Sequence, residues 1–164
     1  MTNSIVYIDS EINPQDKRIL DLGAIGEDRA RLHTPSVHEF YRFIEKADFV
    51  VGHNVIYHDL AYLTPHFEAP LRAQPIDTLY LSPLLFPRHP YHRLLKDDKL
   101  SSDTLSNPLS DAEKAKHLFE DEVNAYHALT PRKKRIFCAL LYDRPEFRGF
   151  FDYLGYTPYR TDLA

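Results

Sequence analysis

The stretch IVYIDSEI, residues 5–12, decides the fold. Its first half is a continuous run of β-branched and aromatic residues, which is typical of a buried strand. Two acidic residues, Asp9 and Glu11, follow directly. Side chains two positions apart on a strand point to the same face of its sheet. The sequence therefore predicts a buried strand that ends by presenting two carboxylates side by side.

Outward from this stretch, strand and helix patterns alternate along the chain. Ser36 followed by Glu39 is a capping-box pattern, which indicates that a helix begins there. Residues 87–110 lack periodicity, so we expect mostly loop with one short helix. We expect strands at residues 4–12, 18–25, 30–33, 48–51 and 75–78, and helices at 36–47, within 53–67, at 79–86, 111–129, 131–141 and 145–154. This alternation predicts the α/β class.

Two further acidic residues stand in informative surroundings. Asp59 lies in GHNVIYHD, which follows a predicted strand, and Asp111 opens a long amphipathic helix. A pair of divalent cations needs several hard oxygen ligands that converge from separate elements, and these residues with Asp9 and Glu11 form such a set. Simpler explanations remain open: a strand end in solvent for Asp9 and Glu11, a surface helix position for Asp59, and a carboxylate favoured by the helix dipole for Asp111.

Composition limits the class of protein. The chain has 164 residues, which most simply form one domain, and a formal net charge of −4, which argues mildly against a general polyanion binder. Its one cysteine, Cys138, excludes an internal disulfide and suits a reducing compartment, so we expect a cytoplasmic protein. No run of 18 apolar residues is present, and we expect no association with a membrane.

These motifs resemble those of the DEDD, or DnaQ-like, 3′–5′ exonucleases. Asp9-Ser10-Glu11 matches the first family motif, residues 52–59 match the second, and Asp111-Ala112 matches the end of the third. The resemblance covers about residues 4–128. It implies an RNase H-like fold, with a mixed sheet of about five strands flanked by helices. We expect an exonuclease-like domain at residues 1–129, followed at 130–164 by a helical C-terminal extension that leads towards a linker.

The same resemblance implies a chemistry for the four acids. Two divalent cations, Mg²⁺ or Mn²⁺, would be held by Asp9, Glu11, Asp59 and Asp111, with Asp9 bridging both and Glu11 helping to orient the 3′ end. Such a pair activates water and stabilises the leaving oxygen in phosphodiester hydrolysis. The substrate implied is DNA, as single strands or frayed 3′ ends.

The sequence departs from the family at the general base. Ser106 stands where one branch has histidine, and Asn107 stands where another has tyrosine; neither side chain accepts a proton near neutral pH. His92, upstream in the aperiodic stretch, is the candidate replacement, whereas we expect His58 to point away from the cations. Loss of such a base lowers the rate by about 10²–10⁴.

Substrate contacts are the less defined part of the predicted site. Ile12-Asn13-Pro14 replaces the Thr and Gly that often follow the first motif and contact the terminal nucleotide, so the mode of 3′-end binding is open. The candidate substrate-binding residues are His53, Asn54, Ser106 and Asn107. For His53 and Asn54 a structural role, hydrogen-bonding the turn before the helix, is the competing interpretation.

Two wider hypotheses concern partners. The segments PYHRLLKDDKL and NPLSDAEKAKHLFEDEV make the chain similar to a nuclease-like module attached to some bacterial RecQ-type helicases, which implies a fused or associated helicase. The departures at Ser106 and after Glu11 favour an alternative function, a degenerate nuclease fold that binds DNA ends or a partner protein with little or no catalysis. An ordinary α/β interaction domain is the third possibility.

Overall fold

The computed structural model describes residues 3–94 and 107–156. Five strands form one sheet: β1 (Ile5–Ile12), β2 (Ile19–Gly26), β3 (Arg31–Thr34), β4 (Phe49–Gly52) and β5 (Gln74–Asp77). The helices are α1 (Val37–Ile44), α2 (Leu60–Leu63), α3 (Thr78–Leu85), α4 (Pro108–His127), α5 (Pro131–Leu141) and α6 (Pro145–Tyr153). A π-helical turn, η1 (Val55–Asp59), and a 3₁₀ turn, η2 (Thr64–His66), flank α2.

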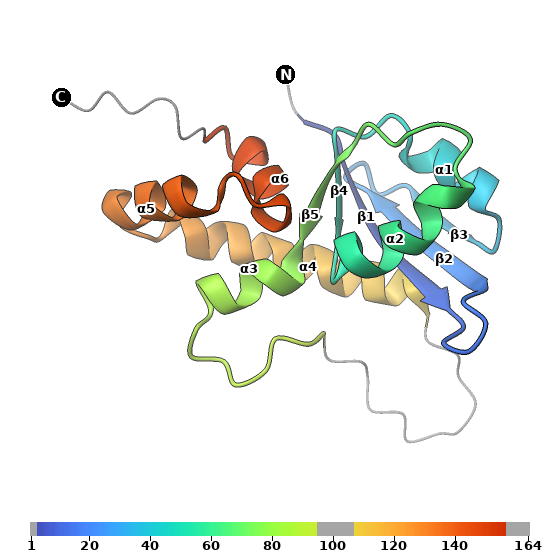
Figure 1. The fold of residues 1–164 in the computed structure, drawn as a ribbon, viewed down its shortest axis with the longest axis horizontal. Helices are drawn as coiled ribbons and strands as arrows, with labels where there is room; N and C mark the ends of the chain where they lie inside the picture. Colours follow the sequence, from blue (N-terminus) through green and yellow to red (C-terminus); the bar gives the residue numbers. More distant parts are fainter. Residues whose placement is uncertain (1–2, 95–106, 157–164) are drawn as a thin grey trace.

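The sheet is mixed, in the order β3-β2-β1-β4-β5. β1 pairs antiparallel with β2 and parallel with β4, so it occupies the centre of the sheet. β2 and β3 are antiparallel, and β4 and β5 are parallel. Figure 1 shows α4 running along one side of the sheet while α1 and α2 lie on the other. The sequence prediction of an α/β fold with a mixed five-stranded sheet flanked by helices is confirmed.

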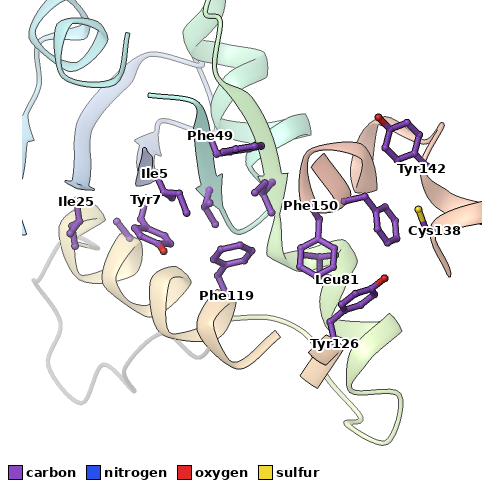
Figure 2. Close-up of a cluster of buried hydrophobic side chains, with 14 residues drawn as sticks. Ile5, Tyr7, Ile25, Phe49, Leu81, Phe119, Tyr126, Cys138, Tyr142 and Phe150 are labelled. Carbon is purple, nitrogen blue, oxygen red and sulfur yellow. The ribbon is translucent and has the colours of Figure 1, made fainter. Parts of the chain in front are cut away.

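The side chains of β1 alternate between two hydrophobic cores. Ile5 and Tyr7 belong to the core beneath α4, and Val6 and Ile8 belong to the core beneath α1 and α2. This alternation follows from the two-residue repeat of a strand, and it explains the unbroken apolar run: a strand covered on both faces needs apolar residues at every position. Figure 2 shows the first core, in which Phe119 of α4 lies close to Tyr7.

The segment after α4 forms the two helices that the sequence predicts, α5 and α6. α6 packs on β5, and its Phe150 and Phe151 are fully buried in the α4-side core. A Cβ at Gly149 would lie 2.1 Å from the carbonyl oxygen of Pro75, so only glycine allows α6 this close to β5. Within the described residues, no helix is both long enough and apolar enough to cross a membrane.

The structure differs from the sequence expectation at one helix boundary and in one loop. The long helix α4 begins at Pro108 rather than at Asp111, because Asn107 caps it: the Asn107 side chain accepts a hydrogen bond from the Leu109 amide at 3.0 Å. Proline at the first helical position then extends the helix upstream of the periodic pattern. Residues 86–94 form no helix, residues 95–106 fall outside the described residues, and residues 108–110 belong to the first turn of α4.

Candidate active site

The two acids of β1 share one face of the sheet, as predicted. Asp9 pairs with Gly23 of β2, and Glu11 pairs with Asp21. A Cβ at Gly23 would lie 2.4 Å from the backbone of Pro108 and Leu109, so the first turn of α4 rests directly on β2 at this point. The missing side chain of Gly23 therefore lets α4 approach the end of β1.

Asp111 meets the β1 acids as a result. Asp9, Glu11 and Asp111 each offer a carboxylate oxygen, and these three oxygens all lie within 4.8 Å of one another. Asp111 is only 6 % exposed, and Asp9 and Glu11 are partly buried. They line a pocket of about 390 Å³, which we call the acidic pocket. Its described walls are Asp9, Ser10, Glu11, Ile12, His53, Asn54, His58, Asp59, Leu79, Arg93, Leu94 and Asp111.

Asp59 lies on the same pocket but outside the close group of three. Its side chain is 2 % exposed and accepts a hydrogen bond of 2.5 Å from the Ser10 hydroxyl. It is positioned where η1 passes into α2. All four predicted acids therefore line one cavity, with three of them in ligand-sharing distance and the fourth oriented towards Ser10.

His58 corrects a sequence expectation. We expected this residue to point away, but it lines the acidic pocket, and its Nδ1 lies 3.8 Å from Asp59 Oδ2. The contact with Asp59 raises the pKa of His58, burial opposes this, and the charges of Asp59 and Glu11 add to the increase. Residues Val55–Asp59 form a π-helical turn, and the wider repeat of that turn sets the direction of this side chain.

A lysine lies beside the acidic group. Lys114, one turn along α4, places its Nζ 3.2 Å from Asp111 Oδ1, with 26 % of the side chain exposed. The i,i+3 spacing on a helix makes the two residues surface neighbours. The positive charge of the Lys114 ammonium group offsets part of the negative charge that the three clustered carboxylates create.

His53 holds together two segments that form the pocket. Its Nε2 accepts the Leu94 amide hydrogen at 3.3 Å, so Nδ1 carries the proton and donates to Thr78 Oγ1 at 2.8 Å. Burial lowers the pKa of His53 to about 4, and the ring is therefore neutral at pH 7. Both ring nitrogens are used within the protein, which supports the structural interpretation for this residue.

Asn54 and its partner Asp77 shape the turn that carries Asp59. Asn54 has a left-handed backbone, φ 65°, and Asp77 accepts hydrogen bonds from the amides of Asn54, Ile56 and Leu79 at 2.8–3.1 Å. Asp77 is fully buried; burial raises its pKa, and these three bonds oppose the shift. Sequence reasoning missed Asp77, although an aspartate before an apolar helix is a cap signal that would have found it.

The other candidate residues lie elsewhere. His92 does not line the acidic pocket; it lines a larger neighbouring cavity between residues 86–94 and α4. Asn107 caps α4 and is also absent from the lining of the acidic pocket. Ser106, the residue at the position of the family base, falls outside the described residues.

Comparison with known proteins identifies the fold. The structure of NrnC from Brucella melitensis matches this chain with a TM-score of 0.59 and 17 % sequence identity, over 92 % of this chain and 85 % of NrnC. No family model matches the sequence, and no curated protein does. The likeness shows that this chain and NrnC share a fold over most of their length, and the mixed five-stranded sheet flanked by helices is consistent with the predicted RNase H-like fold.

Proposed function

We propose that this protein is a metal-dependent nuclease that removes nucleotides from the 3′ ends of DNA. The observation that carries the proposal is the convergence of Asp9, Glu11 and Asp111, whose carboxylate oxygens lie within 4.8 Å of one another. They come from two separate elements, β1 and α4, on a fold shared with NrnC, and the order of the acids along the chain resembles the DEDD motifs. The DNA specificity and the 3′ polarity come from the motif resemblance.

The donor set fits hard divalent cations. Mg²⁺ and Mn²⁺ prefer carboxylate oxygens, and all four candidate ligands are carboxylates. Asp9, Glu11 and Asp111 would hold the cations, with Asp59 on the adjacent wall completing the set. When bound, two such cations supply an activated water and neutralise charge on the phosphate.

The chain's own residues prepare the pocket for this role. Ser10 keeps Asp59 on the pocket wall through its 2.5 Å hydrogen bond. His53 and Asp77 fix the segments on either side of Asn54, so the wall that faces a bound phosphodiester is built before the substrate arrives. Preorganisation of this kind lowers the barrier of a reaction at the site.

The direct test is hydrolysis of an oligonucleotide labelled at its 3′ end. The protein with Mn²⁺ or Mg²⁺ should release the label as mononucleotides, and chelation with EDTA or the Asp9→Ala substitution should abolish release. An oligonucleotide blocked by a 3′ phosphate should be degraded more slowly if the enzyme begins at the 3′ end. Equal label retention by wild type and Asp9→Ala, at high protein concentration, would contradict the proposal.

The second candidate function is a nuclease fold that binds DNA ends or a partner without efficient catalysis. Ser106 in place of a histidine favours it, because serine is a poor base at neutral pH. The Ser106→His variant separates the two functions. A gain of about 10²-fold or more in cleavage would mean that the site is assembled and lacks its base. Undiminished DNA binding with no gain would favour the binding module.

The cellular setting is part of the same proposal. Partnership with a fused or associated RecQ-type helicase would supply the unpaired 3′ ends that such a nuclease uses. Cys138 is buried among α5 and α6 and forms no disulfide, which suits the reducing cytoplasm where we place the protein. Co-purification of the chain with such a helicase would test the partnership.

A further inference from the structure

A second cavity adjoins the acidic pocket. It lies between residues 86–94 and the exposed side of α4, encloses about 860 Å³, and is lined mainly by apolar and aromatic groups. We refer to it as the ring groove. Arg93 and Leu94 line both cavities, so the two are adjacent. Lys114, which contacts Asp111 of the acidic pocket, also lines the ring groove.

Three rings form one wall of the ring groove. Phe86 and His89 are nearly parallel, with ring centroids 5.3 Å apart and an interplanar angle of 14°. His92 continues the series at 6.5 Å from His89 and 25°. Leu118 and Ala125 of α4 line the opposite wall. Because the rings stack on one another, a further planar ligand can extend the series at its ends, on the outer faces of Phe86 and His92.

The charges of the ring groove suit a phosphodiester backbone. Arg93 and Lys114 stand at the side shared with the acidic pocket, and Asp121 is the single acid in the lining. A strand that ran from the acidic pocket into the ring groove would carry its phosphates past these two cations. Its bases would then meet the ring wall, because stacking on aromatic side chains tolerates any base sequence.

We propose that the ring groove binds the unpaired bases of a nucleic acid strand whose reacting phosphate lies in the acidic pocket. This inference rests on the proposed nuclease function and adds where the bases of its substrate lie: against Phe86, His89 and His92, unpaired, since the partner strand would occupy the space that the groove wall needs. Volume supports this occupant, because ligand pockets typically enclose about 300–1,000 Å³.

The test measures binding, so that it does not depend on turnover. Fluorescence anisotropy with Ca²⁺ in place of Mn²⁺ compares an intact single-stranded oligonucleotide with versions that lack one base, at each of the last three positions in turn. Wild type should bind the intact strand about tenfold more tightly than at least one abasic version, the size expected for one stacked base.

Two substitutions assign this preference to the ring groove. Ala125→Trp fills the cavity from α4, and His89→Ala removes the middle ring from an exposed position in a segment without helix or strand. Each should bind intact and abasic strands with the same weak affinity. Asn124→Trp is the matched control: it adds the same bulk to the next, exposed residue of α4, outside the groove lining, and should behave as wild type.

The outcomes separate the groove from the nuclease. The proposal of base binding in the ring groove is overturned by either of two results. One is a folded His89→Ala protein that keeps the wild-type preference, and the other is a wild type that binds intact and abasic strands equally. Release of a 3′ label with Mn²⁺ in those cases leaves the nuclease proposal standing. If the preference for intact strands is lost in His89→Ala and no label is released by the wild type, base binding in the ring groove is supported and the nuclease activity is contradicted.

Discussion

Two carboxylic acids of α4 have opposite surroundings. Asp111 joins Asp9 and Glu11 on the acidic pocket, whereas Glu122, three turns along the helix, is fully buried under α3. The Ser82 hydroxyl donates to Glu122 Oε1 at 2.8 Å, but Oε2 is buried and has no hydrogen-bond partner among the described residues. Burial raises the pKa of Glu122 to about 9, so this acid is protonated at pH 7.

The raised pKa predicts how stability depends on pH. The unfolded chain releases the Glu122 proton near pH 4.5, and the folded chain keeps it up to about pH 9. The contribution of Glu122 to stability is therefore present below pH 4.5 and is lost as pH rises towards 9. Glu122→Gln, which stays neutral, should be more stable than wild type by about 1 kcal/mol or more at pH 8 in urea unfolding, with a smaller difference at pH 5. Glu120→Gln, the same change at an exposed position two residues away, should show no such trend.

Lys114 occupies space next to the predicted cations, so its charge should oppose their binding. Lys114→Met should raise the affinity for Mn²⁺ by about three- to tenfold, as measured by calorimetry, because like charges in proximity repel. Lys116→Met, whose cation lies 5.8 Å from the Tyr7 ring on another side of α4, is the matched control and should leave the affinity unchanged. A lower affinity in Lys114→Met would mean that the lysine mainly orients Asp111.

For single residues, the sequence predicted side-chain positions correctly where a regular strand sets the direction of the side chain. Asp9 and Glu11 were predicted to share a face from strand periodicity alone, and the structure confirms it. His58 was placed wrongly, because its direction depends on a π-helical turn that no short pattern indicates. The i,i+3 spacing of Lys114 and Asp111 is visible in the sequence, but their place beside Asp9 and Glu11 depends on which face of α4 meets the sheet.

At the scale of elements, the site depends on how closely α4 approaches β2. Gly23 makes this approach possible, since a Cβ there would lie 2.4 Å from backbone atoms of Pro108 and Leu109. These backbone atoms belong to the start of a helix and cannot move aside as easily as the end of a flexible side chain. The first turn of α4 carries Asp111, so displacement of that turn changes the acidic pocket directly.

Gly23→Ala should therefore weaken both fold and cation binding. We expect a loss of about 1–3 kcal/mol in the free energy of unfolding, as for other overpacked sites, together with a large loss of Mn²⁺ affinity. Gly149→Ala is the comparison, because its Cβ would meet Pro75 at 2.1 Å in the contact between α6 and β5, whose residues do not line the acidic pocket. It should lower stability in chemical unfolding yet retain Mn²⁺ affinity. If both variants retained the wild-type Mn²⁺ affinity, the close approach of α4 to β2 would not be required for the cation site.

Element boundaries show why sequence alone placed the strands well and the loops poorly. Apolar runs such as residues 5–8 need burial on both sides, so their strands were found within one residue of their ends. The start of α4 was misplaced by three residues because the periodic pattern begins after the Asn107 cap and Pro108. The ring groove had no sequence signal, since residues 86–94 form it without helix or strand.

At the scale of the whole molecule, β1 joins the two cores to the site. Its alternating residues bind the α4 side to the α1 and α2 side, and its end carries Asp9 and Glu11. The third acid comes from α4, which covers one of these cores. A cation held between β1 and α4 would therefore stabilise the packing of this long helix against the central strand.

Cation binding should consequently stabilise the entire fold. At a free concentration of about 100 times the dissociation constant, Mn²⁺ should add about 2.7 kcal/mol, which corresponds to a rise of about 5–10 °C in the thermal midpoint for a chain of this length. The Asp9→Asn variant should respond differently to Mn²⁺ when its thermal midpoint is measured by differential scanning calorimetry. Without Mn²⁺ it should melt at or above the wild-type midpoint, because one of three clustered charges is removed, and with Mn²⁺ it should gain little. A wild-type midpoint that stays constant across the Mn²⁺ titration would mean that the three oxygens within 4.8 Å do not form a cation site.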